Sequence, residues 1–150
     1  MNPTTDLGEL VLWDVPFAHD RLPAVSVLGE QQEAQTTLVV RGMGSYPGWI
    51  VDFASSPVVL QHDEMNSPAS AVFESALSRG MSGCAFKWLN SPALAEYGRI
   101  GAAAVFDQQG LPMQHFVVVG GDWIVQILSI HEPSLQRFDG PVSLLFDASF

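Results

Sequence analysis

The sequence predicts an α+β fold, in which a mainly antiparallel β-sheet carries one clear amphipathic helix and one or two short helices packed on it. Three observations lead to this prediction. Apolar segments of strand length recur along the 150 residues, one capped segment has helical periodicity, and the last third contains a strong hairpin signal. Because the chain has neither an internal repeat nor a linker, residues 1–150 are expected to form a single domain.

Strand patterns dominate the first sixty residues. Glu9–Val15 is a first candidate, and Thr36–Met43 is rich in β-branched residues. Gly48–Ala54 alternates between two faces, as a half-buried strand does, and Pro57–Gln61 is a short fourth candidate. The polar stretch Gly29–Thr37 is expected to be an exposed loop or the start of a strand.

The clearest helix is predicted over Pro68–Arg79, with Ser67 as its N-cap and Gly80 as its stop. The apolar residues of this segment recur at helical spacing and form a single stripe: Ala69, Val72, Phe73, Ala76 and Leu77. The same combination of signals, with Ser91 as cap, proline next and Gly98 as stop, predicts a second, short helix.

The last part of the chain is again rich in strands. Cys84–Leu89 and Arg99–Asp107 are candidates, and Gln114–Val119 and Trp123–His131 bracket Gly120-Gly121-Asp122, a strong hairpin signal. The second arm of this hairpin is apolar on both faces, which is typical of a central strand that is covered on both sides.

Two segments near the C-terminal end are less regular. Ser134–Phe138 is predicted to form one helical turn. For Val142–Phe146 a closing strand and a terminal helix both stay open, because the pattern alone does not decide between them.

The charge is strongly acidic. Sixteen Asp and Glu against six Lys and Arg give a formal net charge of −10, while 47% of the residues are hydrophobic. The hydrophobic content excludes a disordered chain, and the acidic charge argues against nucleic acid as a partner, since phosphate binding needs a basic patch. No segment is apolar for long enough to suggest a membrane partner, and no signal peptide is recognisable, so a cytoplasmic location is expected.

The order of the elements resembles that of the PsbP-like α/β/α sandwich superfamily. The resemblance depends on a strand with Gly101-Ala102-Ala103-Ala104, the hairpin 114–131 and the tail Phe146–Phe150, and it covers residues 36–150. Proteins of this superfamily include photosystem accessory proteins, bacterial lipoproteins and adaptor chaperones that load type VI secretion effectors. The first 35 residues depart from the pattern, and the resemblance assigns a function to no individual residue.

Few residues suggest catalysis. His62 is followed by two carboxylates and lies between a strand and the predicted helix, which makes it the best candidate for acid–base chemistry. Asp52 lies within a predicted strand and, if buried, needs a partner such as Arg41. Cys84, the single cysteine, is a candidate nucleophile or a small buried hydrophobe. The histidines lack zinc-ligand spacing, and neither a metal nor a cofactor is expected.

These observations favour a non-enzymatic bacterial protein that binds a basic partner protein through an acidic surface. Two such roles stay open, an immunity protein that neutralises a toxin and an adaptor chaperone for a secreted effector. The acids expected to form the partner-binding surface are Glu30, Glu33, Asp63 and Glu64.

The alternative is a small enzyme or ligand-binding domain with an apolar pocket between sheet and helices, for which His62, Asp52 and Cys84 would be tested first. A homodimer formed through an exposed sheet face is also open.

Overall fold

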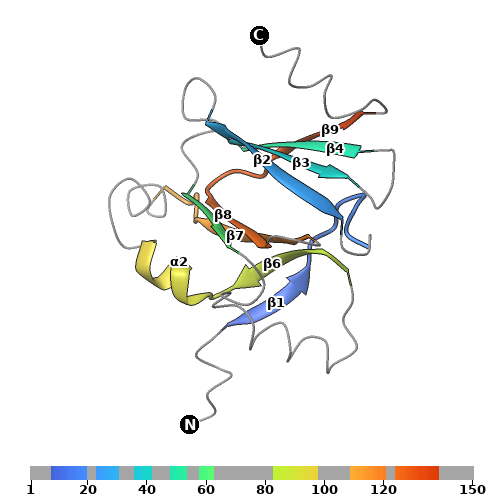
Figure 1. Ribbon diagram of the computed structural model, residues 1–150. Coiled ribbons are helices and arrows are strands. Elements are labelled where there is room, and N and C mark those ends of the chain that lie inside the picture. Colours follow the sequence, from blue (N-terminus) through green and yellow to red (C-terminus); the bar gives the residue numbers. More distant parts are fainter. Residues whose placement is uncertain are drawn as a thin grey trace.

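The computed structural model describes residues 8–19, 23–30, 36–41, 48–53, 58–62, 83–97, 109–120 and 124–138, which contain nine β-strands and one helix (Figure 1). The elements are β1 (Glu9–Leu12), β2 (Ala24–Glu30), β3 (Thr36–Arg41), β4 (Gly48–Phe53), β5 (Val58–His62), β6 (Ala85–Leu89), α2 (Pro92–Tyr97), β7 (Gln114–Val119), β8 (Ile124–Ser129) and β9 (Ser134–Phe138).

The strands form two antiparallel sheets that lie one above the other (Figure 1). The five-stranded sheet has the order β1-β6-β7-β8-β5, and the four-stranded sheet has the order β2-β3-β4-β9. The chain passes from the five-stranded to the four-stranded sheet between β1 and β2, returns between β4 and β5, and crosses again between β8 and β9. The described part of the protein is therefore a β-sandwich with a short helix beside it.

The predicted α+β class is wrong. The described residues are mostly antiparallel strand, and α2 is their only helix, six residues long. The sequence pattern shows that a strand needs cover on both faces, but it does not show whether a helix or a second sheet supplies it. Here the second sheet covers one face of the first. The predicted helix 68–79, the strand 99–107 and the segment 142–146 lie outside the described residues.

Two further segments differ from the prediction. Ser134–Phe138 is the strand β9 and not a helical turn, because its backbone pairs with Asp52–Gly48 of β4 in antiparallel register. The strand β2 was not predicted, although Val25 and Val27 alternate with polar or small residues. Its pairing with β3 is irregular between Val27 and Glu30, where the polar stretch begins.

Most of the other predicted strands are confirmed, as is the short helix that begins at Pro92 after Ser91. The hairpin of β7 and β8 has the expected antiparallel register, from Gln114 opposite Ser129 to Val119 opposite Ile124. All six residues of β8 are buried, and the strand lies between β7 and β5, as the apolar pattern on both of its faces predicted.

The main hydrophobic core lies between the two sheets. Phe116 of β7 is at its centre, with its ring centroid 4.9 Å from that of Trp13 and 5.3 Å from that of Phe53 in the other sheet. Leu38 and Val51 of the four-stranded sheet are also fully buried there. These contacts join the sheets, because each aromatic ring removes a large apolar area from water.

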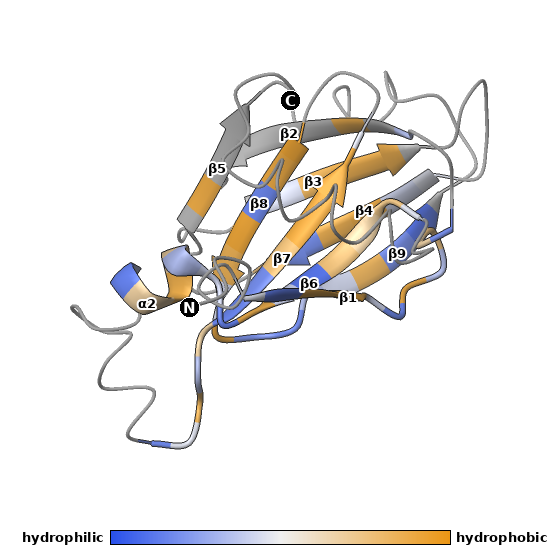
Figure 2. Ribbon diagram, turned by 90° about the horizontal axis from the view of Figure 1, so that it is seen from below, coloured by the Kyte–Doolittle hydropathy of each residue, from blue (hydrophilic) through white to orange (hydrophobic). Residues whose placement is uncertain are grey.

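A second hydrophobic cluster lies on the other face of the five-stranded sheet. It contains Leu10, Phe86, Trp88, Val117 and Ile124, which project from four neighbouring strands. Figure 2 shows the strands β7 and β8, which contribute to it, as largely hydrophobic. The helix α2 contacts β7 and so lies beside this sheet, away from the four-stranded one (Figure 1).

Candidate functional site

Three buried polar side chains form a hydrogen-bonded chain on the outer face of the five-stranded sheet. His115 Nδ1 lies 2.6 Å from Ser91 Oγ, and His115 Nε2 lies 2.7 Å from Gln126 Oε1. Because an amide oxygen only accepts, Nε2 carries the imidazole proton and Nδ1 accepts the hydroxyl proton of Ser91. We call Ser91, His115 and Gln126 the buried polar triad.

Each member of the triad comes from a different element. His115 and Gln126 project from β7 and β8, and Ser91 is the N-cap of α2, where its Oγ also accepts the Leu94 N–H at 3.1 Å. Trp88 of β6 packs its ring against the imidazole, with the centroids 5.0 Å apart. The triad therefore connects α2 to the centre of the five-stranded sheet.

The order serine, histidine, amide resembles a nucleophile, a base and an orienting group, so its capacity for catalysis needs to be weighed. Burial lowers the pKa of His115 to about 4, and the hydrogen bond that His115 donates to Gln126 opposes this only in part. An imidazole with so low a pKa is a weak base near pH 7. Ser91 is only 1% exposed, so its hydroxyl does not face solvent. These properties favour a structural role for the triad.

Replacing Ser91 with alanine is expected to lower the free energy of unfolding by about 2 kcal/mol. The change removes the N-cap of α2 and leaves His115 Nδ1 without the hydroxyl that it accepts from. Urea denaturation measures the effect. Ser134→Ala on the exposed strand β9 is the matched control and should change the stability by less than about 0.5 kcal/mol. Equal effects of the two substitutions would contradict the assigned role of Ser91.

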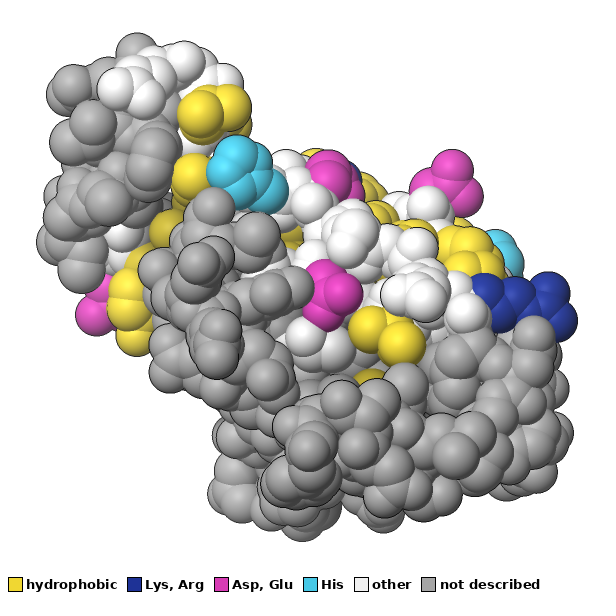
Figure 3. Space-filling model, turned by 90° about the horizontal axis from the view of Figure 1, so that it is seen from above, with side chains coloured by type: hydrophobic (Ala, Val, Ile, Leu, Met, Phe, Trp, Pro, Cys, Tyr) yellow, Lys and Arg dark blue, Asp and Glu magenta, His cyan; other side chains and the backbone are white. Residues whose placement is uncertain are grey.

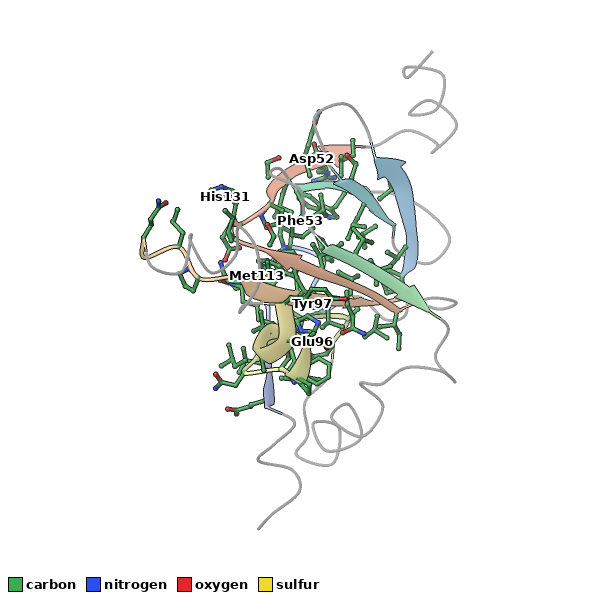
Figure 4. All side chains as sticks on the ribbon, turned by 90° about the vertical axis from the view of Figure 1, so that its left-hand side faces the viewer. Asp52, Phe53, Glu96, Tyr97, Met113 and His131 are labelled. Atoms are coloured by element: carbon green, nitrogen blue, oxygen red, sulfur yellow. The ribbon has the colours of Figure 1, made fainter. Side chains whose placement is uncertain are left out.

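Asp52, one of the three candidates predicted from the sequence, lies on β4 and is half-buried. Its partner is Thr37 on β3, directly opposite in register, whose hydroxyl donates to Asp52 Oδ1. The expected pairing with Arg41 is wrong, because the register places Arg41 opposite Gly48, at the other end of the strand pair. Figure 4 shows Asp52 on the four-stranded sheet and Glu96 and Tyr97 on α2, well separated from it.

Cys84 is buried in the core between the sheets. Its thiol donates to the backbone oxygen of Phe17 at 3.1 Å, and its own backbone joins the loop 13–19 to β7 through Ala18 and Val119. This environment is that of a small hydrophobic side chain with a weak hydrogen bond. His62 ends β5, which is separated from β6 and the neighbouring Cys84 by β7 and β8, so the structure does not bring the two residues together.

The four acids predicted to bind a partner are only partly placed. Glu30 ends β2, with its backbone opposite Thr36. Glu33, Asp63 and Glu64 lie outside the described residues. The part of the chain that the structure describes contains no group of three or more His, Cys, Asp or Glu side chains that could hold a metal ion. Within the same ranges, no helix is long and apolar enough to cross a membrane.

The acids that are described lie mostly on the surface. Glu9, Asp14, Glu96 and Glu132 are all exposed. Lys87 forms an ion pair with Glu132 at 2.5 Å and also donates to Gln114, so its charge is locally compensated. Acidic and hydrophobic side chains lie interspersed on the face shown in Figure 3.

The strand β9 is exposed along the four residues whose side chains are described. It is the outer strand of the four-stranded sheet, next to β4, and Ser134, Leu135, Gln136 and Arg137 are all exposed. Leu135 lies opposite Val51, which faces the core, yet 36% of its surface remains accessible. An exposed outer strand with an apolar side chain is the type of edge to which other extended chains add.

Sequence reasoning missed both the buried polar triad and the exposed strand β9. His115 was not among the candidate residues, although its alternation with Val117 and Val119 places it on a buried sheet face. Gln126, the polar residue within the apolar run of β8, was the corresponding signal, since a buried amide needs a partner. For β9 no such signal exists, because Leu135 is the single apolar residue among Ser134–Arg137 and so produces no apolar periodicity.

Comparisons with protein-family models, curated proteins and solved structures found no match. The resemblance to the PsbP-like superfamily therefore stays a prediction.

Proposed function

We propose that this chain is a non-enzymatic protein that binds a basic partner protein in the bacterial cytoplasm. Its two candidate roles are an immunity protein that neutralises a toxin and an adaptor chaperone for a secreted effector. The exposed edge at β9 carries the proposal, because β9 is an outer strand on which Ser134–Arg137 are exposed residues, including the partly accessible Leu135.

The charge supports a basic partner. The chain has a formal net charge of −10, and Glu9, Asp14, Glu96 and Glu132 are exposed among the described residues. Charges of this kind attract an oppositely charged protein over several ångströms and accelerate association more than they increase affinity. This attraction would direct a basic partner toward the acidic surface before the two proteins come into contact.

The enzymatic alternative has less support. Its three candidates His62, Asp52 and Cys84 lie on separate elements, and Cys84 is buried in the core. The buried polar triad has the right order of groups, but its serine is 1% exposed and the pKa of His115 is too low for an effective base at neutral pH.

Affinity capture at low salt is expected to isolate one stoichiometric basic protein from a lysate of the source organism, identified by mass spectrometry. The association rate of the purified pair should then fall by roughly tenfold or more when the salt concentration is raised from about 0.02 to about 0.3 M. A rate that does not change with salt would contradict acidic steering. Repeated capture of no stoichiometric protein would overturn the proposed function itself.

A further inference from the structure

We propose that an extended segment of the basic partner adds to β9 as the next strand of the four-stranded sheet. In this arrangement an apolar side chain of the partner covers Leu135, and a lysine or arginine opposite Ser134 reaches Asp52. The proposal rests on the proposed function and names the docking edge and the chemistry of the segment that binds there.

The backbone of β9 provides the first argument. The strand pairs with β4 from Ser134 opposite Asp52 to Phe138 opposite Gly48, and no described strand lies on its other side. An outer strand directs alternate N–H and C=O groups away from its sheet, which is the pattern that an added strand needs. Main-chain hydrogen bonds would give the complex its affinity, and the side chains would give it specificity.

The inner face of β9 provides the second argument. Leu135 lies opposite the fully buried Val51 and so faces the core between the sheets, but 36% of its surface is accessible. An added strand places a side chain beside Leu135 on the same face, since neighbouring strands align residue by residue. An apolar residue at that position would extend the core by one strand and remove the exposed part of Leu135 from water.

The outer face supplies the charge. Asp52 lies opposite Ser134, and among the described residues its hydrogen-bond partner is Thr37, which donates to Oδ1 and not to Oδ2. Ser134 has a small side chain, so it does not block the path from an added strand to Asp52. Two strand spacings are about 10 Å, a distance that a lysine or arginine and an aspartate span together. A basic residue opposite Ser134 therefore meets a carboxylate.

A second copy of this chain fits the edge less well. Each copy has a formal net charge of −10, so two copies repel each other at low salt. The same negative charge attracts a basic partner and so favours its association. The net charge of the chain thus favours a foreign strand with alternating apolar and basic residues over a second copy.

The test uses two synthetic peptides of about ten residues, one in which valine alternates with lysine and a matched one in which glutamate replaces lysine. Each is titrated at low salt into the full chain labelled with ¹⁵N. The lysine peptide is expected to shift the amide signals of Ser134–Arg137 and to bind at least roughly tenfold more tightly than the glutamate peptide. Binding of neither peptide, or signal changes confined to other segments, would overturn the proposal.

Three variants separate the contributions. Leu135→Lys should lower the affinity for the lysine peptide roughly tenfold. Asp52→Asn should reduce the difference in affinity between the lysine peptide and the glutamate peptide. Leu111→Lys is the matched control, because Leu111 is 40% exposed but lies in the loop before β7. Equal losses for Leu135→Lys and Leu111→Lys would contradict docking at β9. All variants are first checked for an unchanged thermal midpoint.

Two further results distinguish this proposal from the proposed function. A captured partner protein that binds Leu135→Lys and Asp52→Asn as tightly as the unmodified chain would overturn docking at β9 but leave a protein-binding function intact. A dimer in sedimentation that Leu135→Lys dissociates would assign the edge to a second copy and overturn the choice of occupant.

Discussion

Lowering the pH from 6.5 to 4 is expected to reduce the free energy of unfolding by about 3 kcal/mol through His115 alone. Burial lowers the pKa of the folded imidazole from 6.5 to about 4. Well above pH 6.5 the imidazole of His115 is neutral in both the folded and the unfolded state, so it adds no pH dependence there. Between pH 6.5 and 4 the unfolded chain binds a proton that the folded protein does not, and stability falls steadily over this interval.

The measurement is a series of urea denaturation curves at pH 7, 6, 5 and 4.5 for the unmodified protein and for His115→Gln. For each protein the free energy of unfolding is plotted against pH. Carboxylates also titrate in acid, so the contribution of His115 is the difference between the slopes of the two plots. Ser134→Ala, at an exposed position that carries no titratable group, is the control and should keep the slope of the unmodified protein. If His115→Gln also has the same slope as the unmodified protein, burial does not lower the pKa of the His115 imidazole.

Replacing Phe116 with alanine is expected to lower the free energy of unfolding by about 3–5 kcal/mol. The ring is fully buried and lies between Trp13, which follows β1, and Phe53, which belongs to the opposite sheet. Its removal takes away apolar contacts on both sides and leaves a cavity where the sheets meet. For a chain of this length the melting temperature should fall by roughly 10 °C.

Two substitutions calibrate this effect. Phe116→Leu keeps most of the volume and should cost about 1.5 kcal/mol. Leu111→Ala removes an exposed apolar side chain and should change the stability by less than about 0.5 kcal/mol. If Phe116→Ala were as mild as Leu111→Ala, Phe116 could not be the central contact between the sheets.

Local patterns predicted many individual elements of this fold. Proline after a serine cap marked the start of α2, and the Gly-Gly-Asp turn marked the hairpin of β7 and β8. The apolar residues on both faces of β8 correctly indicated a central strand. Such signals depend on residues close in sequence, where periodicity and turn chemistry act directly.

The arrangement of the strands could not be obtained in the same way. The pairs β1 with β6 and β4 with β9 join segments far apart in the chain, and nothing local distinguishes one large sheet with helices from two sheets. β9 itself was predicted as a helical turn, because Ser134–Arg137 are all exposed and so show no alternation. Its identity as a strand comes entirely from its pairing with β4.

The candidate sites depend on the same long-range pairing. His115 meets Ser91, 24 positions away, and Gln126, 11 positions away, and no local pattern connects these three residues. Asp52 was correctly recognised as a carboxylate in a strand that needs a partner, but the register selects Thr37 and not Arg41. Sequence reasoning thus identified residues that need partners, while the pairing of strands selected those partners.

The passage of the chain between sheets also affects how the protein is made. β9 follows every other described strand, yet its partner β4 comes much earlier in the chain, and the register joins Trp49 to Arg137. Contacts of such large sequence separation require loop closure before they provide stability, so they form slowly, on a scale of roughly milliseconds to seconds. During synthesis β4 therefore leaves the ribosome long before the strand that completes its sheet, and its open side is available to other chains in that interval. The binding edge proposed at β9 comes into existence only when β9 itself has been made.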